Sequence, residues 1–404
     1  MNSLQFCADT LAGYGASESE ILELLAYNQN VFAPPLLEHL CQPQLEPYLA
    51  TWEQYAKESA TVGAYATLKP HLVQLQFPIL AGISETEDYR AATRKGKSTE
   101  QIKSATGLIL LQPEQLQLYI HQTLAGAIPV LVAGNRPDFI SLVQALTKRN
   151  EPKPIPDSMG ACIVEGYNNW HRVRQYQQQW FDKNQNQYHE LNWAVEFQRL
   201  IQRPELYQDR FILLSRGAYS NVAATELSLG EQQWLELSLK IRLEHECTHY
   251  VTRCWFGSMR NNILDELIAD YRGIVSAIGN YRADWFLHCV GLEAFPTYRQ
   301  GGRLENYRGD PLLSEGAFKV LQGLVKTAAE NLEKFEQKSR QPVRTRQEEM
   351  AILMALTTLR LEELASNQGV SLIETAVNYQ KQLILNSNEI KTRLEKTVKH
   401  FPIK

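Results

Sequence analysis

The feature that most constrains the fold of this chain is a pair of histidines four residues apart, in the segment His245-Glu246-Cys247-Thr248-His249. On an α-helix, residues with this spacing lie about 40° apart around the axis, so both imidazoles can reach one ion. Glu246, between them, is then placed to take a proton from a metal-bound water. The HExxH pattern therefore indicates a metal site only if the segment is helical.

The residues around this motif give two conflicting signals. Apolar residues alternate with polar ones, as is typical of a strand, at Leu235, Leu237, Leu239, Ile241 and Leu243. However, helix-favouring Leu, Glu, Lys and Arg dominate the segment. Ser228-Leu229-Gly230-Glu231 has the form of a capping box, and Gly257 is typical of a helix end. Because a helix with leucines all round is a buried one, we predict a buried helix over about residues 229–256.

A second helix follows, with Asn261-Asn262 as its N-cap and Gly279 as its end. Its apolar stripe consists of Ile263, Leu264, Leu267, Ile268, Tyr271, Ile274, Val275 and Ile278. At about 100° per residue, Glu266 and Asp270 lie together on one edge of this stripe, whereas Asp265 points toward solvent. We therefore predict Glu266 as the third metal ligand and Asp270 as the acceptor of a ligating histidine's free N–H.

HExxH followed by ExxxD on the next helix resembles the gluzincin metallopeptidases, the group of thermolysin and related zinc aminopeptidases. The resemblance covers about residues 210–280, and the separation of His249 and Glu266 (266 − 249 = 17 residues) is slightly short for the group. It implies one zinc ion held by His245, His249 and Glu266. It also implies that Glu246 is the general base and that a Tyr, His or Arg stabilises the oxyanion. The candidates for that last role are Tyr298, Tyr307, His288, Arg299 and Arg303.

Gly217-Ala218-Tyr219-Ser220-Asn221 resembles the Gly-Ala-Met-Glu-Asn element that lines the cleft of those aminopeptidases. Ser220 stands where the aminopeptidases carry the glutamate that grips a substrate amino terminus. This departure argues against aminopeptidase activity. We favour a plain turn, which follows a strand predicted near residues 211–215.

Elsewhere the chain divides into three regions: a mainly helical one over 1–104, a mixed one over 105–227, and a helical one over 228–404. In the mixed region we predict strands over 107–111, 128–133, 161–165 and 211–215, a helix opened by Pro113, and another over 137–148. Residues 84–104 are polar and are expected to be a linker or surface loop. These patterns predict an α+β fold, in which a mixed α/β N-terminal part with a small sheet precedes a helical, zincin-like lobe that carries the metal site.

Composition narrows the classes of function. The net charge of −4 gives no electrostatic footprint for nucleic acid, and no apolar run is long enough to span a membrane. The first twenty residues do not read as a signal peptide, and the six cysteines are scattered without a CxxC. We therefore expect a cytoplasmic zinc metallopeptidase that acts on a peptide or protein substrate. The sequence does not indicate its oligomeric state.

Three other interpretations compete with this one. A di-iron protein needs a second ExxH, and only His249 has a glutamate three residues before it. Peptide deformylases take a cysteine as third ligand, but Cys162 lies in an unsuitable Gly-Ala-Cys-Ile context. The serious rival is a non-catalytic or non-peptidase protein with this fold, in which zinc is structural and the chain is a scaffold or maturation factor.

Overall fold

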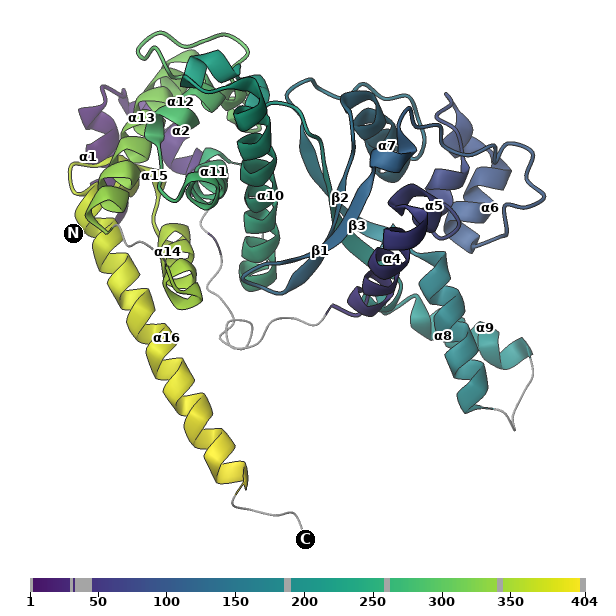
Figure 1. The fold of residues 1–404 in the computed structure, drawn as a ribbon. Coiled ribbons are helices and arrows are strands. Elements are labelled where there is room, and N and C mark those ends of the chain that lie inside the picture. Colours follow the sequence, from purple (N-terminus) through teal and green to yellow (C-terminus); the bar gives the residue numbers. More distant parts are fainter. Residues whose placement is uncertain are drawn as a thin grey trace. The chain divides into compact units, whose positions relative to one another are not determined.

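The computed structural model describes residues 3–29, 32, 46–184, 190–257, 262–339 and 344–399. They form two compact units, which Figure 1 draws as ribbons. The first unit contains Met1–Pro43 and Ala218–Lys404, and the second contains Gln44–Gly217. The predicted mainly helical region 1–104 is thus shared between both units, and the predicted boundary at 227/228 lies ten residues beyond the boundary at Gly217.

A four-stranded mixed sheet in the order β1-β2-β4-β3 forms the centre of the second unit. β1 (Gln117–Gln122) is antiparallel to β2 (Ala127–Val132), β2 is parallel to β4 (Gln208–Leu214), and β4 is antiparallel to β3 (Ala161–Asn168). The strands predicted over 128–133, 161–165 and 211–215 are therefore confirmed. Helices α4 (Leu49–Val62) and α7 (Arg136–Lys148) pack on the face that carries Leu131, Phe211 and Leu213.

The predicted strand over 107–111 and the predicted helix after Pro113 are wrong. Residues 107–111 have no regular secondary structure, and the side chains of Ile109 and Leu111 are 80% and 70% exposed. Pro113–Gln115 is a single 3-10 turn that leads into β1. The Leu111 N–H donates to the Asp138 carboxylate instead of to a neighbouring strand. β1 itself was missed because its sequence, QLYIHQ, buries no side chain fully and has no strong apolar pattern.

The predicted loop over 84–104 contains a helix, α6 (Glu87–Lys95). Its Thr86 side chain caps the first turn by accepting from the Tyr89 N–H. Only Tyr89, Ala92 and Thr93 of this helix are buried. Because the buried face is small and charged residues dominate the segment, its sequence lacks the apolar stripe from which a helix is predicted. The remaining short helices of this unit are α5 (Ala64–Leu68), η1 (Val73–Gln76), η2 (Ile83–Glu85), α8 (Trp170–Lys183), α9 (Glu190–Leu200) and η4 (Pro204–Leu206).

The described part of the first unit contains helices and loops but no strand. Its described α-helices are α1 (Ser3–Gly13), α2 (Glu18–Tyr27), α10 (Glu231–Phe256), α11 (Ile263–Ile278), α12 (Ala283–Val290), α13 (Glu315–Lys338), α14 (Arg346–Thr358), α15 (Leu361–Ala365) and α16 (Gly369–Lys399). Three 3-10 turns, η5 (Tyr219–Asn221), η6 (Ala224–Leu227) and η7 (Arg303–Tyr307), connect them. A small mixed sheet in one unit and helices in the other confirm the α+β fold. Within the described ranges, no helix has the length and apolar character needed to cross a membrane.

Candidate metal centre

The helix that carries HExxH extends over Glu231–Phe256 and ends at Gly257 in a left-handed conformation, so the predicted helix over about residues 229–256 is confirmed. The predicted capping box is wrong, because the N-cap is Gly230 without a side-chain hydrogen bond and Ser228 ends the preceding turn η6 in a left-handed conformation. The second predicted helix is also confirmed as α11. Its N-cap is Asn262, whose side chain accepts from the Asp265 N–H at 3.3 Å, and it ends at Gly279. Asn261, the other half of the predicted cap, lies outside the described residues. Both elements therefore follow from local sequence signals.

The two helices run antiparallel, and their residues meet in register. Going along α10, Ile241 meets Gly273, His245 meets Asp270, and His249 meets Asp265. A Cβ atom on Gly273 would lie only 2.7 Å from the Ile241 carbonyl oxygen. Only a glycine allows this close approach of the two backbones, and the approach brings the short carboxylate side chains of α11 to the histidines of α10.

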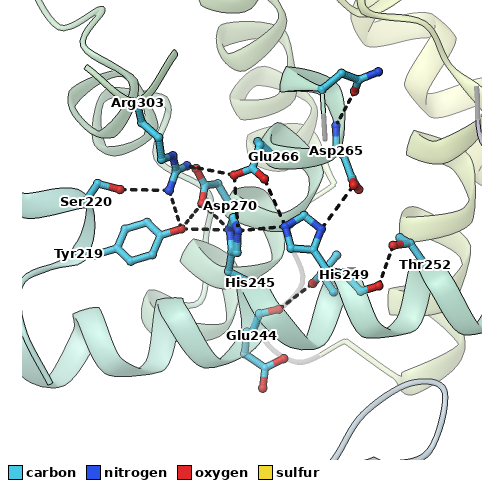
Figure 2. Close-up of polar contacts among 12 residues, drawn as sticks. Tyr219, Ser220, Glu244, His245, His249, Thr252, Asp265, Glu266, Asp270 and Arg303 are labelled. Carbon is cyan, nitrogen blue, oxygen red and sulfur yellow. Dashed lines mark hydrogen bonds and ion pairs between the residues drawn. The ribbon is translucent and has the colours of Figure 1, made fainter. Parts of the chain in front are cut away.

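Three donor groups converge between these helices (Figure 2). The Nε2 atoms of His245 and His249 are 3.1 Å apart. The Glu266 carboxylate lies 3.5 Å from His245 Nε2 and 3.3 Å from His249 Nε2. The side chains are only 7–8% exposed. The three residues predicted as ligands from the sequence are thus brought together, and this buried group could hold a metal ion.

Each histidine also has a carboxylate on the opposite side of its ring. His245 Nδ1 lies 2.8 Å from Asp270 Oδ1, and His249 Nδ1 lies 3.4 Å from Asp265 Oδ2. The prediction that Asp265 points to solvent is wrong, because its side chain is fully buried. That prediction assumed that α11 buries one stripe, whereas every residue from Ile263 to Ile274 is buried.

The protonation of these rings follows from their partners. A carboxylate accepts hydrogen bonds and does not donate them, so the nitrogen facing Asp270 or Asp265 carries the proton. The Nε2 atoms then face each other and Glu266, where a proton or a metal cation can lie between the three groups. Burial alone would lower the pKa of His249, but Asp265 and Glu266 raise it well above its ordinary value. The negative charge of these carboxylates makes the cluster attractive to a cation.

Glu246 lies on α10 between the two histidines and is half-buried. Burial raises the pKa of its carboxyl, against the lowering effect of His245 and His249. A carboxyl with a raised pKa is suited to accept and release a proton near neutral pH. Its neighbour Glu244 points away from the three donors in Figure 2.

The turn at residues 219–221 contacts the residues around the donor cluster, although its sequence only predicted a turn. Three side chains along one face of α10 hold the segment: Ser238 accepts from the Tyr219 N–H, Trp234 donates to the Val222 carbonyl, and Arg242 donates to the Ala218 carbonyl. The Tyr219 hydroxyl lies 2.9 Å from His245 Nδ1 and donates to Asp270. The likeness to the aminopeptidase element was the one sequence signal that singled out this segment.

Ser220 and Asn221 in this turn have positive φ values of 49° and 58°. Such left-handed conformations are unfavourable for residues other than glycine and are often found at functional sites. Here the strained turn places the Tyr219 hydroxyl and the Ser220 hydroxyl next to the same arginine, Arg303.

Arg303, which we considered as an oxyanion stabiliser, lies behind Asp270 in a buried network. Its guanidinium donates to the Asp270 carboxylate and, at 3.0 Å each, to the hydroxyls of Tyr219 and Ser220. It is also 3.9 Å from the Glu266 carboxylate. Burial by itself would raise the pKa of Asp270, but the charges of Arg303 and His245 outweigh it and lower that pKa. Arg303 therefore keeps Asp270 ionised and partly offsets the negative charge of the cluster.

The other oxyanion candidates divide into two groups. Tyr307 adjoins the donors, because it hydrogen-bonds to Glu266, and burial together with that carboxylate raises its pKa. The remaining three are bonded elsewhere: Tyr298 to Gly302 and Glu305, Arg299 to Glu293 and the His288 carbonyl, and His288 to the Asp284 carbonyl on the exposed side of α12. Spacing from the motif could not separate these groups, because a loop without periodicity carries all of them except His288.

A model of one protein family matches residues 9–368, which is most of the chain. The chain belongs to this family, DUF7005, a family of unknown function. No curated protein and no solved structure matches the chain. The DUF7005 match includes α10, α11 and the three donor residues, so the candidate metal group lies within the matched region.

Proposed function

We propose that this protein is a zinc-dependent hydrolase, and specifically a gluzincin-like peptidase that cleaves a peptide bond with zinc-activated water. The observation that carries the proposal is the convergence of three donor groups. The Nε2 atoms of His245 and His249 are 3.1 Å apart, and they lie 3.5 and 3.3 Å from the two different oxygens of the Glu266 carboxylate. In a tetrahedral site with ligands about 2.0–2.1 Å from zinc, two donors lie about 3.3 Å apart. The separations of 3.1–3.5 Å within the donor group are close to this spacing, which supports zinc as the bound ion.

The chemistry of the donors also favours a catalytic ion. Two imidazoles and one carboxylate form the described cluster. Structural zinc sites usually have four protein ligands, often cysteines, whereas catalytic sites have three and leave one position for water. Cys247 and Cys254 lie on the same helix but are not members of the cluster.

Zinc, when bound here, would polarise a carbonyl group and lower the pKa of a water molecule. Glu246 would accept the proton of that water and pass it to the leaving amine. Asp270 and Asp265 would hold the rings of His245 and His249 in the orientation that ligation needs. Tyr307, beside Glu266, is the residue we propose to donate a hydrogen bond to the developing oxyanion.

The alternative is a structural ion in a scaffold or maturation factor. The low exposure of the donor side chains, 7–8%, favours it, because a buried ion has restricted access to substrate. We propose a cytoplasmic location for either function. The five described cysteines are free thiols, as is typical of that compartment.

A comparison of Glu246→Gln with Glu244→Gln separates the two functions. The zinc-loaded full chain is incubated with a mixed peptide library, and new termini are identified by mass spectrometry. We expect Glu246→Gln to retain zinc and to lose hydrolysis by a factor of about 10² or more, whereas Glu244→Gln keeps both. A zinc-loaded wild type that cleaves no peptide would support the structural ion, and an active Glu246→Gln chain would contradict the role of the general base.

A further inference from the structure

A pocket of about 590 Å³ lies in the first unit beside the N-terminal end of α11. It is lined by Glu23, Ala26, Tyr27, Gln29, Asn262, Gly309, Asp310, Pro311, Leu312 and Leu313. Asn262 and Leu313 are buried and form its floor, whereas Asp310 and Leu312 are exposed and form its rim. The pocket thus leads from the base of α11 to solvent.

Two hydrogen-bonded connections join this pocket to the metal centre. Asn262 on its floor caps α11 by accepting from the N–H of Asp265, the residue whose carboxylate faces His249. Tyr27 on its wall donates to the Tyr307 carbonyl at 2.6 Å, and Tyr307 in turn hydrogen-bonds to Glu266. Asn262 and Glu266 are four residues apart at the start of α11, about 6 Å along the helix axis, so the pocket floor lies within a side chain's length of the donor cluster.

The pocket combines apolar walls with negative charge. Tyr27, Pro311, Leu312 and Leu313 contribute apolar surface, and Glu23 and Asp310 contribute carboxylates, whereas no basic residue is among the described residues that line it. The Glu23 carboxylate accepts hydrogen bonds from the Ser314 hydroxyl, at 2.6 Å, and from the Ser314 N–H. An aliphatic stem that ends in a cation matches this arrangement, because the stem can lie on the apolar wall while the cation meets the acidic rim.

We propose that this pocket binds an arginine or lysine side chain of the peptide substrate and thereby selects cleavage sites next to a basic residue. The inference rests on the proposed peptidase function. An acidic side chain would be repelled by Asp310 and Glu23. A neutral side chain of the same length would keep the apolar contacts but lose the attraction to the two carboxylates.

The test uses the zinc-loaded full chain and matched peptides that contain arginine or its neutral isostere citrulline at the selected position. Because the acidic rim is open to solvent, we expect the arginine peptide to have a kcat/KM about fivefold higher. Asp310→Asn should remove most of this preference without affecting zinc content, since Asp310 is exposed and outside the donor cluster. Glu18→Gln, an exposed residue on α2 that does not line the pocket, should retain the preference.

The same peptides, labelled with a fluorophore, are also bound to the zinc-loaded Glu246→Gln chain and followed by anisotropy. A preference for arginine that Asp310→Asn removes supports the pocket assignment even if no peptide is cleaved, in which case only the hydrolytic function fails. Equal binding and equal cleavage of both peptides, or a preference that survives in Asp310→Asn, overturns the assignment.

Discussion

Replacing Asp265 or Asp270 with asparagine removes the charge behind one histidine of the donor cluster and leaves the shape of the side chain unchanged. Both carboxylates are fully buried, and each faces an Nδ1 atom. An amide is a weaker acceptor than a carboxylate, so the ring it faces becomes a poorer ligand and is held less firmly. We therefore expect both variants to bind zinc more weakly than the wild type.

The distances predict which variant loses more. Loss of a partner of this kind costs about 10–100-fold in metal affinity, or about 1.4–2.7 kcal/mol. The separation of 2.8 Å between His245 and Asp270 is that of a strong hydrogen bond, whereas the 3.4 Å between His249 and Asp265 is longer than the usual range. We expect a loss of about 100-fold for Asp270→Asn and about 10-fold for Asp265→Asn.

Competition with a chromogenic zinc chelator at fixed pH measures both losses directly. Asp284→Asn is the matched control, because Asp284 pairs with Arg282 on the surface, and it should bind zinc like the wild type. A larger loss for Asp265→Asn than for Asp270→Asn, or affinities within twofold of the wild type for both, would refute the assignment of these carboxylates.

Three further predictions concern packing, charge and pH. Gly273→Ala should destabilise the first unit by about 1–3 kcal/mol in urea unfolding, because its Cβ would meet the Ile241 carbonyl oxygen at 2.7 Å; an unchanged midpoint would contradict the close approach. Arg303→Ala should cost about 3–5 kcal/mol, since it leaves the buried Asp270 carboxylate without its cation, and a loss below 1 kcal/mol would be inconsistent with that pair. Burial, with His71 and Arg174, lowers the pKa of His171 to about 4. As the pH falls, the unfolded chain therefore protonates His171 at a higher pH than the folded chain does, so the free energy of unfolding present above pH 6.5 should decrease as the pH drops toward 4. In His171→Gln this part of the pH dependence of the melting temperature should disappear, and its persistence would contradict the lowered pKa of His171.

Local patterns were sufficient for the centre of the site. The i, i+4 spacing of the histidines and the position of Glu266 and Asp270 on one helix face are properties of single helices. Both helices end at the predicted glycines, and α11 begins at its predicted cap, whereas the capping box predicted for α10 does not form. The role of Asp265 could not be predicted in this way. A helix that is buried all round has no solvent side, and only the packing of its neighbours shows this.

The contacts that complete the site come from distant parts of the chain. Tyr219 and Arg303 lie in turns without periodicity, 26 and 58 residues from His245 in opposite directions along the sequence (245 − 219 and 303 − 245). Tyr219 and Arg303 contact Asp270 only because of tertiary packing, and no local pattern in the sequence predicts these contacts. The edge strand β1 was missed for a related reason, because a strand with few buried side chains carries almost no apolar signal.

The zinc content of the purified full chain after exhaustive dialysis tests the central claim most directly. We predict one zinc ion per chain in the wild type and in Glu244→Gln, and none in His245→Ala or His249→Ala. A wild-type chain that carries no metal and takes up none from added zinc would contradict the metal centre, as would a His245→Ala chain that retains a full equivalent.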